Sequence, residues 1–437
     1  MAPITTTSPA VAVPRKFMNR SRWFGLIYLI LGVLVIYVAV TAIDPEVASR
    51  FRFGVIRPDF MERLPDDVQT SLRQGVPFPT QTSLLVIGVL LLLAGAMPFI
   101  LSPQIAKRYD NLSLALVFFL LLTAVLIYAA AGKRTDVVSM LADGIRLATP
   151  IALGAMAGIL CERSGVINIG IEGMMLTAAG MGFLGSLYLQ NSSLGLLLAV
   201  LSAMMMAALL AVLAITFKVD QIIAGTVVNI LAVGITGFSR RAFMLDNPFG
   251  APSVFPMIRI PVLGDLPIIG PVLFQNQPIV FLMLILVFVI QFYLFRTKFG
   301  LRHRSVGENP RAADTLGIKV IRTRYLAVLA GGALAGLGGA WFSLETVGSF
   351  DDLMTGGKGF IALAAMIFGN WNPIGAFFGA LLFGFADALQ IKLQILETGI
   401  PYQFIGMLPY ILTMVVLAGV IGKTTPPAAD GVPYEKQ

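Results

Sequence analysis

Charged residues are scarce in this sequence. Only 12% of its 437 residues are Asp, Glu, Lys or Arg, whereas 57% are hydrophobic, and the mean hydropathy is +0.86. Soluble domains carry about 25% charged residues. A soluble fold of this length would therefore lack the polar side chains needed to cover its surface. We infer a polytopic membrane protein whose excess apolar area faces lipid.

Cysteine and histidine are almost absent as well, with Cys161 and His303 the single examples of each. One cysteine excludes an intrachain disulfide. A metal site built from His and Cys is not expected, and a Ser-His-Asp triad would have to be built around His303. We therefore expect no catalytic residues and no bound metal in this chain.

A nucleotide-binding loop is also missing. The stretch GVIGKTT at 419–425 ends like a phosphate-binding loop, but Leu417 stands where that pattern requires its first glycine. The stretch then runs into Pro426 and Pro427, which do not continue as a helix. We expect no cofactor on this chain, so any ATP and Mg²⁺ that drive transport must bind a partner.

Long apolar runs are what the sequence does contain. A bilayer span needs about 20 mostly apolar residues, and the fold class predicted is an all-α transmembrane bundle of ten to twelve spans. Two candidates, 147–160 and 359–371, are short enough to be half-helices or re-entrant elements. The candidate spans are 24–43, 83–101, 112–131, 147–160, 169–189, 194–216, 221–239, 278–295, 325–344, 359–371, 374–391 and 404–422.

The basic residues suggest an orientation. If all the spans cross, Lys and Arg outnumber Asp and Glu in the segments on the N-terminal side, whereas the opposite segments are nearly balanced. This asymmetry places both termini in the cytoplasm. It also explains the net charge of +8 without a nucleic-acid partner. A cleaved signal peptide is the rival interpretation of residues 1–42, but the apolar run there is longer than a signal core.

Glycine and proline mark contacts and loops. Gly154 and Gly158, Gly332 and Gly336, and Gly375 and Gly379 are spaced four apart, which predicts closely packed helix faces. Six prolines between positions 248 and 271 argue against a long helix in the loop 240–277.

One cytoplasmic loop, residues 296–324, combines many basic residues with a helix start at Asn309-Pro310 and a helix end at Gly317. It predicts a short helix parallel to the membrane, suited to pressing against a soluble partner. The alternative is an ordinary basic loop with an incidental helix. The residues predicted to act there are Gly307, Glu308, Asn309, Pro310, Arg311, Ala312, Ala313, Asp314 and Gly317.

Polar residues inside apolar segments are costly and hence functional candidates. Glu172 is the foremost of them, whereas Glu162 and Arg163 favour a structural tie. Asp387 is expected to pair locally with Lys392. The candidates for the transport pathway are Glu172, Asn168, Asn229, Asn370 and Trp371, although a helix-to-helix hydrogen bond is the favoured interpretation of each asparagine.

Two of these stretches together resemble one family. ERSGVINIGIEGMM at 162–175 and GENPRAADTLGI at 307–318 are similar to permease subunits of bacterial ABC importers, of the simple-sugar and nucleoside branch. KVDQIIAGTVVNILAVGIT at 218–236 and PPAADGVPYEK at 426–436 resemble its nucleoside-type members. The resemblance covers about 143–436.

The resemblance implies three regions: an N-terminal extension of about three spans at 1–142, a permease core at 143–422, and a cytoplasmic tail at 423–437. It also implies an inner-membrane location and import of nucleosides, related ribosides or simple sugars. The implied partners are a pair of ATPase subunits, a second and different permease, and an extracytoplasmic binding lipoprotein. The segment 307–318 would be the coupling helix that the ATPases move.

A secondary transporter driven by an ion gradient is the competing hypothesis. It would need several intramembrane ionisable groups and paired broken helices, whereas the spans contain only Glu172 and Asp387.

Overall fold

The computed structural model describes residues 20–52, 75–245, 252, 254–396, 402–407 and 424–436. Contacts divide the chain into two units, one made of residues 1–51 and 74–135 and the other of residues 52–73 and 136–437. Eight described helices are long and apolar enough to cross a membrane, which agrees with the predicted helical bundle. Most of the predicted span 404–422 lies outside the described residues.

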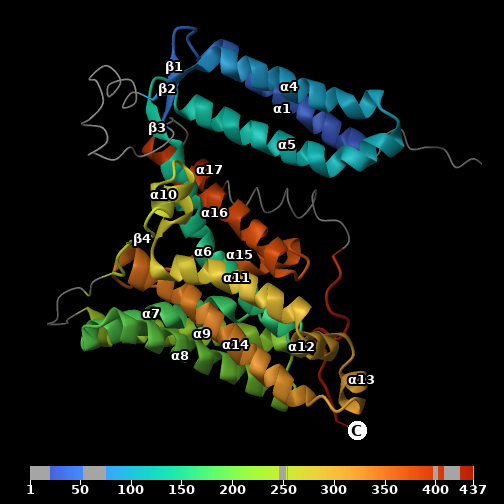
Figure 1. Ribbon diagram of the computed structural model, residues 1–437, viewed down its shortest axis with the longest axis vertical. Coiled ribbons are helices and arrows are strands. Elements are labelled where there is room, and N and C mark those ends of the chain that lie inside the picture. The colour runs from blue at the N-terminus through green and yellow to red at the C-terminus, as the bar shows by residue number, and fades with distance from the viewer. Residues whose placement is uncertain are drawn as a thin grey trace, which may run out of the picture. The chain divides into compact units, whose positions relative to one another are not determined.

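The first unit is a three-helix layer with a small sheet at one end (Figure 1). The fully buried Ser49 connects the sheet to the helices. Its hydroxyl lies 2.8 Å from Thr80 Oγ1 and donates to the Ile127 carbonyl at 2.6 Å. The strands pair in the order β2-β1-β3, with β1 antiparallel to β2. The elements are α1 (Arg20–Ala42), β1 (Ala48–Arg52), β2 (Val76–Pro79), α4 (Thr80–Ile100), α5 (Pro103–Ala129) and β3 (Arg134–Asp136).

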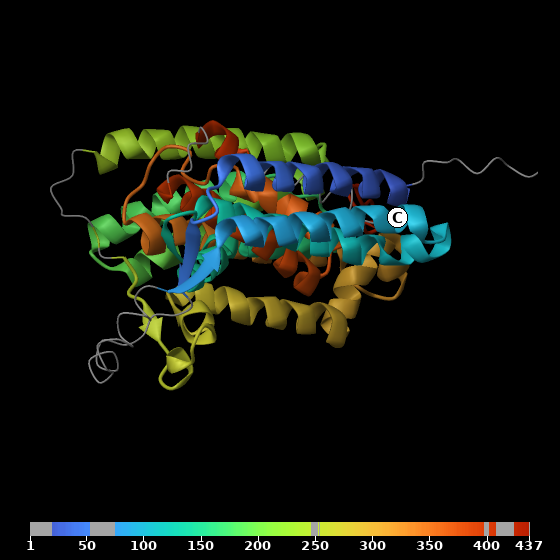
Figure 2. The same ribbon diagram turned by 90° about the horizontal axis from the view of Figure 1, so that it is seen from above.

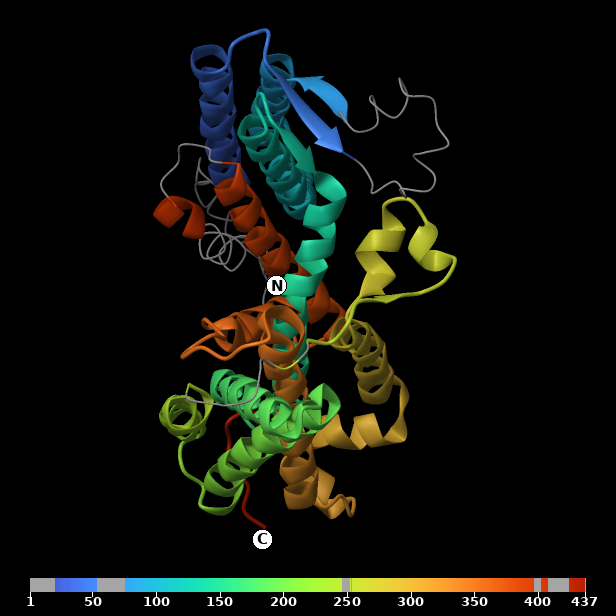
Figure 3. The same cartoon turned by 90° about the vertical axis from the view of Figure 1, so that its left-hand side faces the viewer.

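The second unit is built around α6 (Val137–Glu162), which is buried along nearly its whole length. Figure 2 shows the yellow-green α9 and the gold α11 on opposite sides of this unit, and Figure 3 shows α12 turning sharply away from the end of α11. Its other helices are α7 (Ile171–Leu189), α8 (Ser192–Ala211), α9 (Gln221–Ser239), α10 (Ile269–Leu273), α11 (Pro278–Arg296), α12 (Lys298–Glu308), α13 (Pro310–Thr315), α14 (Val320–Ala340), α15 (Lys358–Phe368), α16 (Pro373–Ile395) and α17 (Tyr402–Gly406).

The described residues of the proline-rich loop form no long helix, as predicted. It contains the five-residue α10 and a two-stranded sheet of β4 (Ile258–Arg259) and β5 (Gln275–Asn276).

Two short candidate spans have different outcomes. The prediction that 147–160 is short is wrong, because α6 begins ten residues earlier, at Val137. Asp143 and Arg146 interrupt the apolar run, but Arg146 pairs with Asp143 at 3.4 Å and donates to Asn276 Oδ1 at 3.1 Å, so the helix continues through them. By contrast, α15 has only 11 residues, too few to cross a bilayer alone.

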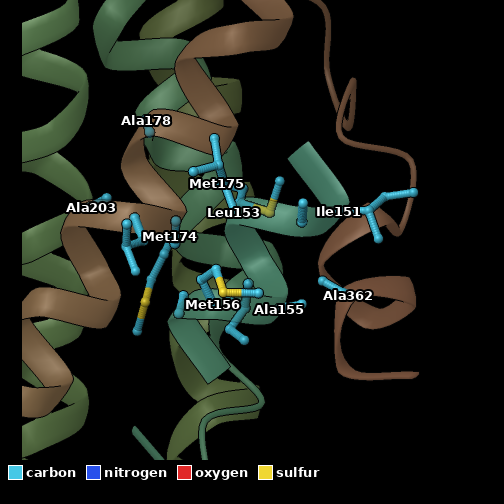
Figure 4. Packing of buried hydrophobic residues seen from close by; sticks show 14 of the residues in the cluster. Ile151, Leu153, Ala155, Met156, Met174, Met175, Ala178, Ala203 and Ala362 are labelled. Atoms are coloured by element: carbon cyan, nitrogen blue, oxygen red, sulfur yellow. The ribbon is translucent and has the colours of Figure 1, made fainter. Parts of the chain in front are cut away.

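The core is apolar and closely packed. Figure 4 shows Met156 of α6 and Met174 and Met175 of α7 among alanines of α6, α7, α8 and α15. The predicted glycine pairs lie at these contacts. A Cβ on Gly332 would lie 2.4 Å from Ala207 Cβ, and one on Gly154 would lie 2.8 Å from Ala362 Cβ. Small residues thus bring the helix backbones together where lipid supplies no hydrophobic drive.

Gly339 of α14 is a position where an added methyl group would meet the backbone of a neighbouring helix. A Cβ there would lie 2.1 Å from the Met175 carbonyl oxygen. Overpacking of this kind costs about 1–3 kcal/mol. We therefore expect Gly339→Ala to lower the thermal unfolding midpoint of the detergent-solubilised protein, measured by size-exclusion fluorescence.

Gly234 of α9 provides the control, since a Cβ there would meet nothing within 4 Å. Gly234→Ala gains about 1 kcal/mol of helix propensity and should leave the midpoint unchanged or higher. Equal midpoints for the two variants would contradict the close α7–α14 contact.

Candidate functional site

The segment 297–318 forms a helix pair at one end of the second unit. The Asn309 side chain accepts from the Ala312 N–H at 3.0 Å and caps α13, whose first residue is Pro310. The helix ends before Gly317, which adopts φ +77°. The short helix expected from Asn309-Pro310 and Gly317 is thus confirmed, at Pro310–Thr315.

One side of this segment is fastened to the unit. Val306, Ala313 and Val320 form a small apolar cluster. A Cβ on Gly307 would lie 2.3 Å from the Arg163 carbonyl oxygen, so only glycine permits this approach. The other side is free, with Arg311 and Ala312 exposed and Leu316 81% exposed.

His303 anchors α12 to the end of α6. Its Nε2 lies 2.8 Å from the Leu160 carbonyl oxygen and donates to it, and its Nδ1 lies 3.3 Å from the Tyr293 hydroxyl. Burial lowers the pKa of His303 to about 4. The imidazole is therefore neutral at pH 7 and acts as a fixed hydrogen-bond link.

The break at 162–175 separates α6 from α7. Glu162, 5% exposed, accepts from the Trp371 indole N–H at 2.6 Å. Arg163 donates to the carbonyl oxygens of Trp371 at 3.1 Å and Asn370 at 3.4 Å. Asn370 and Trp371 both have positive φ, +52° and +54°. The adjacent charges of the break therefore hold a strained turn between α15 and α16 in place.

Glu172 caps the short helix α15. Its carboxylate accepts from Thr355 Oγ1 at 2.6 Å and from the backbone N–H groups of Gly357 at 2.8 Å and Gly359 at 2.6 Å. A carboxylate at a helix N-terminus satisfies free N–H groups and complements the helix dipole. This contact fixes the start of α15 to the start of α7.

Two further pathway candidates, the partly buried Asn229 and the buried Asn168, bind this chain's own groups. Asn229 accepts from the Gly173 N–H at 2.7 Å and donates to the Ile169 carbonyl at 3.0 Å, which joins α9 to the start of α7. Asn168 donates to Cys161 Sγ at 3.4 Å, and its Oδ1 has no partner among the described residues. Contact of these residues with a solute stays a prediction.

Asp387 does not pair with Lys392, and that expectation is wrong. Its carboxylate accepts from Lys358 Nζ at 2.5 Å, whereas Lys392 Nζ lies 3.4 Å from Ser139 Oγ. Residues five apart on an α-helix point in different directions, whereas neighbours on one face are three or four apart. The ion pair therefore joins α15 to α16.

The C-terminal tail, residues 424–436, crosses the same end of the unit and runs beside α12 and α13 (Figure 1). Its backbone N–H groups donate to three acceptors already described. Thr425 donates to Asn370 Oδ1 at 3.0 Å, Ala428 to Glu308 Oε2 at 3.2 Å, and Ala429 to the Gly307 carbonyl at 2.8 Å. The tail therefore binds the helix pair to the α15–α16 turn.

Arg324 of α14 lies beneath the tail and was missed in the sequence, where it is one of many basic residues near a span. It is 2% exposed, and it donates to the Ser164 carbonyl at 3.1 Å and the Val432 carbonyl at 2.9 Å. A buried guanidinium needs such partners. Arg324 therefore joins α14, the break and the tail at one point.

Asp430 of the tail was also missed. A side-chain hydrogen bond joins its carboxyl to that of Glu162, and burial raises the pKa of Asp430 to about 6. Two carboxyl groups can hydrogen-bond only when one of them is protonated. The docked carboxyl pair therefore shares a proton in the pH range, between about 4 and 6, where Asp430 of a released tail is ionised.

No group of three or more His, Cys, Asp and Glu side chains suited to a metal occurs among the described residues. The lone Cys161 is buried. At this end of the unit, hydrogen bonds and close contacts connect the helices to one another.

Comparison with known proteins identifies the family to which this chain is similar. Residues 140–421 match the family model described as "Branched-chain amino acid transport system / permease component". The chain is 41% identical to the guanosine ABC transporter permease protein NupQ of Bacillus subtilis, over 66% of this chain and 94% of NupQ. It is 38% identical to the nucleoside ABC transporter permease protein NupC of Lactococcus lactis, over 68% and 96%.

A more distant similarity involves a second protein of Bacillus subtilis. The chain is 25% identical to the guanosine ABC transporter permease protein NupP, over 63% of this chain and 80% of NupP. No solved structure matches this chain.

Tail docking should depend on pH. Because the pKa of Asp430 is raised from 3.8 to about 6, docking is strongest below pH 4 and weakens as pH rises through 6. Linkage gives about a tenfold change in the docking equilibrium per pH unit within that window. Hydrogen-exchange protection factors for the Ala428 and Ala429 N–H groups, corrected for intrinsic rate, should fall accordingly.

Asp430→Asn should remove this dependence, because an amide donates to Glu162 without a titrating proton. Glu435→Gln is the control: Glu435 pairs with Lys218 at the exposed edge of the same tail, and this variant should retain the dependence. Protection that is flat with pH in the unmodified protein would exclude the shared proton.

Proposed function

Because this chain belongs to the permease components of the branched-chain amino acid transport system family, and so is a membrane-spanning permease subunit of an ABC importer, we propose that it forms part of the translocation pathway for nucleosides or related ribosides and simple sugars. A separate pair of ATPase chains binds ATP and Mg²⁺. A second, different permease completes the pathway, and an extracytoplasmic lipoprotein delivers the solute.

The observation that carries the proposal is the form of α13. A rigid, capped helix presents Arg311, Ala312 and Leu316 outward while its opposite side is fastened to the core. An incidental helix in a basic loop needs no such fastening. A helix that transmits the motion of an ATPase needs an exposed face that the ATPase can contact. It also needs a rigid connection to the membrane helices.

The connection can be followed residue by residue. Gly307 contacts Arg163, and His303 binds the end of α6. Glu162 and Arg163 then hold the turn before α16, and Glu172 holds the start of α15. Displacement of α13 by an ATPase would therefore reach both ends of the half-helix α15 through direct contacts.

Nucleosides are favoured as substrates because the relatives with 41% and 38% identity are named as guanosine and nucleoside permeases. Pairing of two different permeases is supported by NupQ and NupP, two permeases of one organism that both carry the guanosine name. We place the protein in the bacterial inner membrane with both termini in the cytoplasm, as the basic loops indicate.

An ion-gradient transporter is disfavoured by the contacts of Glu172 and Asp387, the two acids that the sequence predicts within spans. Glu172 accepts three hydrogen bonds from this chain, and Asp387 pairs with Lys358. Ion-coupled transport requires ionisable groups that exchange ions or protons with water. These carboxylates are instead occupied by structural partners.

Negative charge introduced on α13 and at Leu316, the residue that follows it, tests whether this helix binds the ATPase. Arg311→Glu and Leu316→Asp alter exposed side chains, so the fold should persist while docking of the ATPase fails. We expect co-purification of the ATPase and solute uptake to fall at least about tenfold, the effect of losing roughly 1.4 kcal/mol of binding. Leu263→Asp, at an exposed leucine of the proline-rich loop, should change neither.

Reconstitution in liposomes separates the competing mechanisms. Accumulation of nucleoside should require the ATPase, the second permease, the binding protein and ATP. Uptake that survives an inactive ATPase but collapses with an uncoupler would instead establish an ion-driven transporter.

A further inference from the structure

A cavity of about 310 Å³ lies at the end of the second unit opposite α13. It is formed by the start of α6, the residue before α11, the turn after α14 and the end of α16. Its polar lining consists of Asp143, Arg146, Gln277, Trp341, Glu345, Thr346 and Lys392. Small-molecule sites usually measure about 300–1,000 Å³ and combine apolar walls with a few placed polar groups, and this cavity fits a compact solute.

Three of its residues, Trp341, Glu345 and Thr346, come from an unusual piece of helix. Residues Trp341–Val347 form a π-helical turn that continues α14. Such turns are rare and are found frequently at functional sites. Trp341 and Glu345 are four apart and therefore project from nearly the same side.

Both side chains carry a polar atom without a protein partner. Trp341 is 4% exposed and Glu345 is 1% exposed. Among the described residues, neither the Trp341 Nε1–H nor Glu345 Oε2 has a hydrogen-bond partner. Buried polar atoms are normally paired. Because both residues line one cavity, a ligand bound there is the partner that would satisfy them.

The carboxylate of Glu345 is nevertheless held firmly. Its Oε1 accepts from the Ile279 N–H at the start of α11, and the Glu345 carbonyl accepts from Gln277 Nε2 at 2.6 Å. One carboxylate oxygen is thus used for orientation and the other is left for a ligand. This arrangement resembles a preorganised binding group rather than a structural ion pair.

The charges around the cavity cancel. Asp143 and Glu345 are opposed by Arg146 and Lys392. Arg146 is already engaged by Asp143, the Asn276 side chain and the Gln275 carbonyl. Among the described residues that line the cavity, Lys392 is then the one cation not held by a carboxylate, and a phosphate bound beside it would also face the carboxylates of Asp143 and Glu345. A neutral polar solute fits this balance better.

We propose that this cavity is a solute-binding site of the permease and takes an uncharged nucleoside. Trp341 supplies an aromatic surface for the base and an N–H for one of its acceptors, and Glu345 Oε2 accepts from an N–H or O–H of the solute. This proposal rests on the proposed function, since it names the groups that would recognise the transported class. Phosphorylated nucleosides are excluded.

The test uses the complete importer in liposomes with radiolabelled guanosine as the probe. Glu345→Gln keeps an oxygen for the Ile279 N–H but removes the charge, and Trp341→Phe keeps the ring but removes the N–H. A hydrogen bond to a charged group is worth enough to change binding by roughly 10- to 100-fold. Glu345→Gln should lower uptake by that factor, and Trp341→Phe, which removes a neutral hydrogen bond, by roughly 2- to 10-fold. ATP hydrolysis in the absence of solute should stay within about twofold of the unmodified importer.

Matched controls make the same chemical changes elsewhere. Trp23→Phe and Glu46→Gln alter exposed residues of the first unit and should leave uptake unchanged. If the unmodified importer moves guanosine and the cavity variants move it equally well, the cavity assignment is overturned while the proposed function stands. If the unmodified importer moves no nucleoside, the proposed function itself fails.

A competition experiment checks the charge argument. Unlabelled inosine should compete with guanosine, whereas guanosine monophosphate should not. Competition by the monophosphate at the same concentration as inosine would contradict a site for neutral solutes.

Discussion

Inside a membrane the protein itself must supply the hydrogen-bond partners of its charged side chains, and the structure depends on the partners it gives to three carboxylates. Each of the three has donors from another segment: Glu162 has the Trp371 indole, Glu172 has the start of α15, and Asp387 has Lys358. These pairs connect segments about thirty to more than two hundred positions apart in the chain. The same contacts that make charge tolerable thus set the positions of the short helices.

Local signals in the sequence were sufficient for local features. Asn309, Pro310 and Gly317 determine where α13 begins and ends, because capping and φ preferences act over a few residues. The glycine pairs likewise identify helix faces, since positions four apart share a side. The 11-residue length of α15 follows from the short apolar run around it.

Features that depend on residues distant in the chain could not be predicted from the sequence. The start of α6 was placed too late because Asp143 and Arg146 look like the end of a span until Asn276 is brought beside them. Arg324 and Asp430 were overlooked because nothing in their neighbouring residues distinguishes them from surface charges. Trp341 and Glu345 become notable only once the bundle leaves their polar atoms unpaired.

The tail adds a consequence for biosynthesis. Residues 424–436 follow every described membrane helix in the chain and are therefore made after them. Until they emerge, Gly307, Glu308 and Arg324 lack the contacts that the tail provides. The membrane helices can thus be inserted before the contacts between the tail, α12 and α14 form. A ribosome that stalls late would leave an inserted subunit that lacks these contacts.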